Sequence, residues 1–258
     1  MNNIDIIRQN EKAWDEKVKN NSPWSIPVTK KEIIQAKDGI FSITLTSNKY
    51  VPRNWFPDEL KNKRILCLGS GGGQQGPILA ATGAIVTVFD ISNNQLEQDE
   101  KVADENNLMI STVQGNMAHL NCFKNNYFDL VFCPISATYV PDVLLVFKEC
   151  YRVLKPGGNF LFGSVNPLIY LFDDKKYNKG IFEVSNKLPF NSLDELNDKE
   201  KVDFLNAKES IEYSHTLEDL IGGQTSAGFV INDFYEDVDD DKICHYISKY
   251  FATKATKI

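Results

Sequence analysis

The sequence predicts an α/β fold: a doubly wound, mostly parallel sheet of seven strands with a C-terminal antiparallel hairpin and an inserted cap. Between residues 64 and 165, short apolar runs of strand type alternate with segments of helical periodicity, which is typical of a parallel sheet covered on both faces. Two further strand-like runs, 229–236 and 245–254, are separated by a short acidic turn, so they are expected to pair antiparallel. Residues 166–214 break the alternation and predict the inserted cap.

The chain is expected to divide into four parts along its length. These are an N-terminal helical or lid segment (1–60), a ligand-binding core (61–165), the cap (166–214) and the C-terminal part of the core (215–258). With 258 residues and a hydrophobic content of 42%, the chain can bury one sizeable core plus a modest insertion.

The N-terminal part predicts two helices and a short strand. Apolar residues recur at helical spacing over 3–20, and Asn, Ser and Pro end that helix at 20–23. Thr29 is expected to cap a second helix over 30–36. The alternation of apolar and polar residues over 41–46 predicts a strand.

The core pattern begins at Arg64 and continues to the C-terminus. Strands are expected at about 64–69, 85–90, 109–114, 128–133 and 159–165, and helices at about 75–82, 92–106, 141–154 and 216–227. Gly228 stops the last of these helices.

A glycine-rich turn between the first core strand and its helix predicts a nucleotide-binding βαβ unit. Glycines from Gly69 to Gly73 let the backbone turn sharply, so that a ligand can approach the main chain and the helix N-terminus. About twenty residues later the second strand ends on Asp90, whose carboxylate can accept hydrogen bonds from both hydroxyls of a ribose.

The glycine spacing alone leaves two classes of nucleotide open. Gly71, Gly73 and Gly76 satisfy G-x-G-x-x-G, the fingerprint of nicotinamide dinucleotide enzymes. Gly69, Gly71 and Gly73 instead form G-x-G-x-G directly at the strand end. An NAD-dependent oxidoreductase, which would use the same βαβ unit, is therefore one alternative.

The ordered segments after the glycine loop favour the second class. Asp90 ends the second strand, Gln114-Gly115-Asn116-Met117 follows the third, and Phe128–Phe132 forms the fourth. Tyr151 to Gly158 ends the next helix. Together with the final hairpin these motifs resemble the class I S-adenosylmethionine-dependent methyltransferases, over residues 60–165 closely and 216–254 more loosely. The string from Cys67 to Gln75 resembles a largely uncharacterised bacterial subgroup of type 11-like methyltransferases.

The resemblance implies an S-adenosylmethionine cofactor and a set of residues that contact it. These are Gly69, Ser70, Gly71, Gly73, Gln74, Gln75, Asp90, Ile91, Asn116, Met117 and Pro134. Two positions depart from the family pattern. Cys67 stands where the family usually has an acidic residue that helps to hold the methionine amino group, and Asn116 stands where Asp is frequent. The amide oxygen of Asn116 can still accept a hydrogen bond from the adenine amino group, although a turn residue is the alternative interpretation.

The resemblance leaves the methyl acceptor open, and the composition narrows its class. A formal net charge of −7 without a basic tract argues against a general nucleic-acid binder and favours a small-molecule acceptor enclosed by the cap. His215 and Tyr139, and less readily Asp142, are candidates for a general base, each with a structural role as the alternative. Trp14 or Trp24 is expected either to pack the N-terminal segment or to roof the cofactor.

Other classes of site have less support. His119 and His245 lack the partner spacing of a metal site, so no metal is expected. The five cysteines form no C-x-x-C pair, there is no signal-peptide pattern, and no apolar run is long enough to cross a bilayer. A cytoplasmic protein without membrane contact is therefore expected. A cofactor-binding module without catalysis, to which the loss of the acid at Cys67 lends some support, is the remaining alternative.

Overall fold

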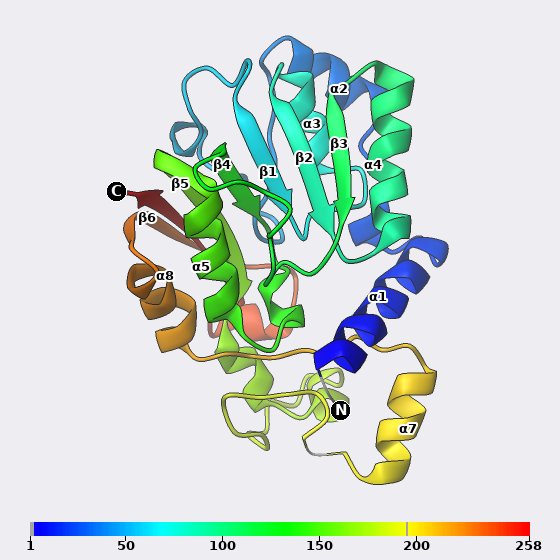
Figure 1. Cartoon of the computed structure of the whole chain (residues 1–258). Helices are drawn as coiled ribbons and strands as arrows, with labels where there is room; N and C mark the ends of the chain where they lie inside the picture. The colour runs from blue at the N-terminus through cyan, green and yellow to red at the C-terminus, as the bar shows by residue number, and fades with distance from the viewer. Residues whose placement is uncertain (1–2, 195) are drawn as a thin grey trace.

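The computed structural model describes residues 3–194 and 196–258, and its centre is one mixed seven-stranded sheet (Figure 1). The strand order is β3-β2-β1-β4-β5-β7-β6. The strands are β1 (Arg64–Leu68), β2 (Ile85–Asp90), β3 (Ile110–Gln114), β4 (Phe128–Cys133), β5 (Leu154–Val165), β6 (Phe229–Asp237) and β7 (Tyr250–Lys257). Strands β1 to β5 are parallel to one another, and β7 is antiparallel to both β5 and β6; the antiparallel pairing of the last two strands was predicted.

Helices cover both faces of the sheet. On one face lie α2 (Lys30–Lys37), α3 (Gln75–Ala81) and α4 (Asn93–Asn106), and on the other lie α5 (Val143–Val153) and α8 (Gly223–Ser226) (Figure 1). Successive residues of β1 serve two separate cores, because side chains on a strand alternate between faces. Ile65 and Cys67 pack with the first group of helices, whereas Leu66 and Leu68 pack with the second.

The N-terminal segment and the cap meet below the carboxyl ends of the strands. Helix α1 (Asn3–Lys19) runs beside α4, and the chain from 166 to 214 passes beneath the sheet with α6 (Asp174–Tyr177) and α7 (Asp198–Asn206) (Figure 1). Thr29 caps α2 through a capping box, in which its side chain and that of Glu32 each bond the other residue's backbone N–H. No helix in the described residues is long and apolar enough to cross a membrane.

The prediction of a strand over 41–46 was wrong. This segment forms only an isolated bridge between Thr44 and Tyr50. The carbonyl of Leu45 accepts the N–H of Ile135 just beyond β4, at 3.1 Å. The segment is therefore bonded to the chain just beyond β4 and is not a strand of the sheet.

Three other element boundaries differ from the prediction. Strand β5 begins at Leu154, because Leu154 pairs with Phe128 ahead of a bulge in the ladder. The helix predicted over 216–227 contains a π-helical turn, Glu218–Gly222, before α8. Strand β7 begins only at Tyr250, because Lys242–His245 forms a 3₁₀ turn that the side chain of Asp241 caps.

Candidate functional site

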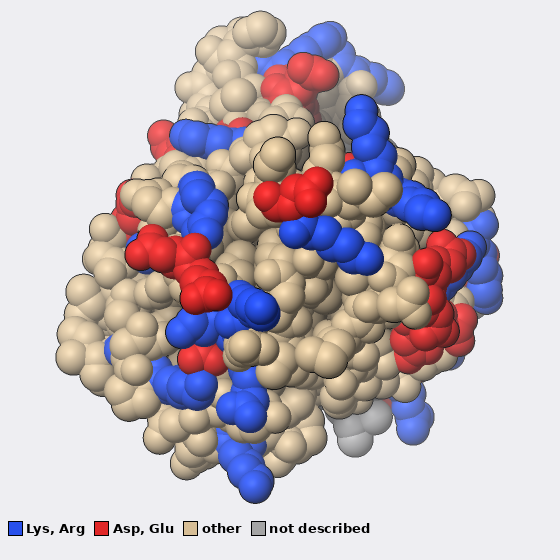
Figure 2. Space-filling model, turned by 90° about the horizontal axis from the view of Figure 1, so that it is seen from above, with Lys and Arg blue, Asp and Glu red and all other residues tan. Residues whose placement is uncertain are grey.

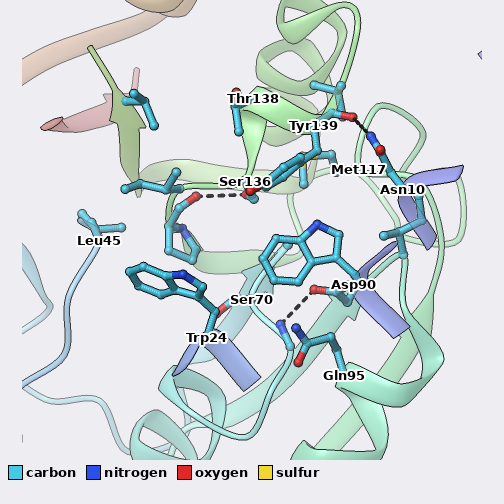
Figure 3. A pocket seen from close by; sticks show the side chains of 18 of the residues that line it. Asn10, Trp24, Leu45, Ser70, Asp90, Gln95, Met117, Ser136, Thr138 and Tyr139 are labelled. Atoms are coloured by element: carbon cyan, nitrogen blue, oxygen red, sulfur yellow. Dashed lines mark hydrogen bonds between the residues drawn. The ribbon is translucent and has the colours of Figure 1, made fainter. Parts of the chain in front are cut away.

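A cavity of about 270 Å³ opens where β1, β2 and β4 end. Its walls come from the glycine loop, the N-terminal segment, the turn after β4 and the cap. All the residues predicted to contact the cofactor line it, except Gly73. Those that do are Gly69, Ser70, Gly71, Gln74, Gln75, Asp90, Ile91, Asn116, Met117 and Pro134. Figure 3 shows Ser70, Asp90 and Gln95 on one side of the cavity, with Thr138, Tyr139 and Asn10 across from them.

The glycine loop is packed so tightly that side chains would not fit at its turning points. At Gly69 the φ angle is +56°, and a Cβ would lie 2.5 Å from the methyl carbon of Met117 and 2.6 Å from Oγ of Ser136. At Gly71 a Cβ would lie 2.7 Å from Cβ of Gln95. The two glycines thus let the main chain form the floor of the cavity.

Asp90 lies at the end of β2 and points along the glycine loop (Figure 3). Its Oδ2 accepts the N–H of Gly71 at 2.9 Å, and its Oδ1 accepts the N–H of Ser92 at 3.0 Å. Burial raises the pKa of this carboxyl, and the backbone hydrogen bonds oppose that rise. The carboxylate has more lone pairs than these backbone hydrogen bonds use, so it can still accept from a ligand hydroxyl.

Asn116 lines the cavity, but its carbonyl oxygen is already engaged in a turn. Oδ1 accepts the N–H of Ala118 at 3.0 Å. The side chain can offer a ligand its Nδ2 donor and one remaining lone pair. Its contact with the adenine amino group therefore stays a prediction.

The N-terminal segment is tied to the glycine loop by a strap, residues 23–28. Nε2 of Gln74 donates to the carbonyls of Pro23 and Ile26 at 2.9 and 3.0 Å. The N–H of Val28 donates to the carbonyl of Gly73 at 2.9 Å. Trp24 of the strap and Trp14 of α1 both line the cavity. Whether they roof a bound cofactor stays a prediction.

The far end of the cavity joins the turn after β4 to the cap. The hydroxyl of Tyr170 donates to Glu212 at 2.9 Å and lies 2.7 Å from Oγ1 of Thr138. Tyr139 packs edge-on against Trp14, with ring centroids 5.2 Å apart. Burial raises the pKa of the Tyr139 phenol well above its usual value, and the neighbouring Glu212 adds to the rise. Tyr139 is therefore a neutral hydrogen-bonding group near neutral pH.

His215, the other predicted catalytic residue, does not line the cavity. It is buried in the αL region at φ +53°, and its Nε2 lies 3.1 Å from the carbonyl oxygen of Ala137. Burial lowers the pKa of its imidazole. The ring supports the 137–139 turn that carries Tyr139, and a catalytic role for it stays a prediction. Asp142 caps α5 by accepting the N–H groups of Leu144 and Leu145.

The sequence analysis missed two residues of α4 that lie against the glycine loop, Gln95 and Asp99. Both are buried, at 2% and 0% exposure. A signal was available: the buried face of α4 also carries Leu96, Val102 and Ala103, so two polar residues interrupt an otherwise apolar stripe. Among the described residues, no group of three or more His, Cys, Asp or Glu is arranged to hold a metal ion.

Comparisons with known proteins point in one direction. The family described as "Methyltransferase domain" matches residues 66–162. The uncharacterized methyltransferase YbaJ of Bacillus subtilis is 42% identical over 253 residues, covering 98% of this chain and 99% of that protein. The ubiquinone biosynthesis O-methyltransferase of Actinobacillus pleuropneumoniae is 32% identical over 111 residues, 42% of this chain and 47% of that enzyme.

Solved structures share the fold at low sequence identity. An S-adenosylmethionine-dependent methyltransferase from Mesorhizobium loti matches with a TM-score of 0.58 at 22% identity, covering 80% of this chain and 95% of that chain. The [4+2]-cyclase SpnF matches with a TM-score of 0.54 at 18% identity, covering 76% of each chain. At such identities the likeness establishes the fold alone.

Proposed function

This chain belongs to the class I S-adenosylmethionine-dependent methyltransferases, and from that premise we propose that its acceptor is a small molecule enclosed between the glycine loop and the cap. One observation carries the proposal: the end of the cavity beyond the glycine loop is lined by cap side chains that bridge to the turn after β4. The hydroxyl of Tyr170 is hydrogen-bonded to Thr138 in the turn after β4, and it also donates to Glu212, which lines the cavity beside it. A polymer would need an open groove at this point.

The residues present fit an adenosyl group. The floor of the cavity is bare glycine backbone that a Cβ would fill, and the carboxylate of Asp90 lies at the tip of β2 with lone pairs to spare. The amide oxygen Oε1 of Gln95, which lines the cavity, is buried without a partner. We propose that Asp90 holds the ribose hydroxyls and that the glycine loop supports the methionine part.

When bound, the cofactor would supply a methyl group on a sulfonium, which would pass to the acceptor by in-line attack at the methyl carbon, with S-adenosylhomocysteine as the leaving group. The chain then has to align the acceptor and exclude water, since holding reacting atoms about 3–3.5 Å apart provides much of the acceleration. We propose that Trp14 and Trp24 close the site from the N-terminal side. Tyr139, which packs against Trp14, would orient the acceptor through its neutral hydroxyl.

A general base is needed only where the acceptor atom carries a proton. Glu212 is the carboxylate at the acceptor end of the cavity, and its hydrogen bond from Tyr170 fixes its orientation. We propose Glu212 as the group that accepts the proton. His215 would then act indirectly by holding the Ala137–Tyr139 turn.

The overall charge gives little support for a nucleic-acid acceptor. Figure 2 shows the face at the amino ends of the strands, away from the cavity, where basic and acidic side chains are interspersed. The formal net charge is −7. Polyanions are usually held by clustered Lys and Arg, so the net negative charge favours a small acceptor.

The proposal is tested by incubating the protein and S-adenosylmethionine with fractionated small-molecule and RNA extracts. The expected result is a small molecule that gains one CH₂ in its mass, in step with S-adenosylhomocysteine formation. Methylation confined to the RNA fraction would contradict the proposal. An Asp90→Ala sample controls for methylation by contaminants.

A second candidate is a cofactor-binding protein that catalyses no methyl transfer. Two observations favour this candidate. Cys67 stands where the family usually has an acid, and the fold is similar to that of a cyclase. Tight binding of S-adenosylhomocysteine without turnover on any fraction would support this candidate. An NAD-dependent oxidoreductase has only the glycine spacing in its favour, and a thermal shift with NAD alone would be its signature.

A further inference from the structure

Helix α4 presents two polar side chains, one turn apart, to the glycine loop. The backbone carbonyl of Gln95 accepts the N–H of Gly72 at 3.0 Å, and the side-chain Nε2 of Gln95 donates to Oγ of Ser25 in the strap at 3.0 Å. One turn further on, Oδ2 of Asp99 accepts the N–H groups of both Gly72 and Gly73, each at 3.0 Å. A single buried carboxylate oxygen therefore fixes two consecutive peptide groups of the loop.

The second oxygen of Asp99 has no hydrogen-bond partner. Among the described residues, Oδ1 of Asp99 and Oε1 of Gln95 are the only buried side-chain polar atoms in this condition. Burial raises the pKa of the Asp99 carboxyl well above its usual value. A fully buried carboxyl with one unpartnered oxygen is costly to the folded state.

The surrounding packing keeps this carboxyl in place. A Cβ at Gly76 would lie 2.9 Å from Oδ1 of Asp99 and 2.7 Å from a methyl carbon of Val88. Cys67, at the end of β1, lies close enough for the Asp99 charge to raise the pKa of its thiol further. The end of β1 is thus apolar, and the carboxyl that meets the loop comes from α4.

We propose that Asp99 is a positioning residue for the cofactor: from α4 it holds the Gly72–Gly73 peptides in the binding conformation, a role that β1, with Cys67, does not supply. Asp99 does not line the cavity and so acts through the loop. The inference rests on the cofactor, which family membership establishes, and not on the acceptor. A failure to find an acceptor would therefore leave it intact.

The test compares binding of S-adenosylhomocysteine to purified variants by calorimetry, with ligand-free melting temperatures alongside. Asp99→Ala leaves the N–H of Gly72 with the backbone carbonyl of Gln95 alone and removes the side-chain acceptor of the Gly73 N–H, and it is expected to bind at least about tenfold more weakly. Asp99→Asn keeps an acceptor oxygen and removes the buried charge. It is expected to bind within about threefold of the parent and to melt at the same or a higher temperature. Asp104→Ala, on the exposed side of α4, is the matched control.

Comparing affinity with the ligand-free melting temperature separates positioning from general stability. Asp99→Ala that binds more weakly while melting within a few degrees of the parent supports a positioning role. Asp99→Ala that binds as tightly as the parent would overturn the proposal. If Asp99→Ala does not fold, Asp99→Asn decides: a loss of more than tenfold at an unchanged melting temperature would contradict a role as loop acceptor.

Discussion

Two carboxyl groups approach the same loop from neighbouring elements and differ in what they can still bind. Asp90, at the end of β2, accepts backbone N–H groups with both oxygens and faces the cavity. Asp99, on α4, uses one oxygen for two N–H groups and is sealed from the cavity. The first is suited to contact a ligand and the second to shape the loop.

Replacing Asp90 by Ala should weaken S-adenosylhomocysteine binding roughly 100-fold. Each hydrogen bond from a ribose hydroxyl to a charged acceptor contributes about 1.5–3 kcal/mol, and about 1.4 kcal/mol corresponds to a factor of ten. Calorimetric titration measures the loss, with Asp104→Ala as the surface control. Unchanged affinity would mean that the ribose binds elsewhere.

Replacing Glu212 by Gln should separate the two halves of the cavity. If Glu212 accepts the acceptor's proton, kcat falls by about 10²-fold or more, while affinity for S-adenosylhomocysteine changes little.

Tyr139→Phe is expected to raise KM for the acceptor, because it removes an orienting hydroxyl and keeps the ring against Trp14. Steady-state kinetics on the identified acceptor distinguish these effects. A matched loss of cofactor affinity in both variants would count against the assignment.

His215 predicts a pH dependence of stability. Burial lowers the pKa of the folded-state imidazole, so the unfolded chain binds more protons as pH falls below about 6.5. The free energy of unfolding should therefore decrease with falling pH in that range, and less steeply in His215→Asn, where Asn tolerates the αL backbone. Denaturant titrations between pH 5 and 8 measure this slope. The same slope in both proteins would show that the imidazole is not held neutral.

At the scale of elements, the strap connects the N-terminal helix to the cofactor loop. Hydrogen bonds to the rest of the chain hold the strap in place. They are made by the side chains of Gln74 and Gln95 and by the backbone N–H of Val28. The periodicity of 3–20 and the cap at Thr29 were predictable, because both are local signals. The course of 23–28 was not, since it depends on side chains about fifty and seventy residues away in sequence.

Replacing Gln74 by Ala should loosen the strap. Two hydrogen bonds are lost, each contributing about 1 kcal/mol, so S-adenosylhomocysteine should dissociate faster by up to about thirtyfold. Hydrogen exchange at the amides of residues 25 and 28 should also rise. Stopped-flow release and exchange mass spectrometry provide the two readouts. Faster exchange with an unchanged dissociation rate would show that the strap does not retain the cofactor.

At the scale of the whole molecule, the sheet order places the site. Strand β1 lies between β2 and β4, so the chain reverses direction across the sheet at the ends of those strands, where ligands bind in open α/β folds. The alternation of strands and helices and the spacing from Gly69 to Asp90 were enough to predict this arrangement. The acceptor end was harder: Tyr170 and Glu212 have no motif, and only the folding of the cap brings them to Thr138. His215 was predicted as a site residue because it lies where the cap meets the core, but its ring is turned to the carbonyl of Ala137 and does not line the cavity.

A crystal structure of the chain with S-adenosylhomocysteine tests the central claim most directly. The ribose hydroxyls should bond to Asp90, the methionine part should lie on the glycine loop, and the sulfur should face the end of the cavity that holds Tyr139 and Glu212. The Gly72–Gly73 peptides should remain on Asp99. A ligand bound away from the glycine loop, or a sulfur facing away from Tyr139, would contradict the account.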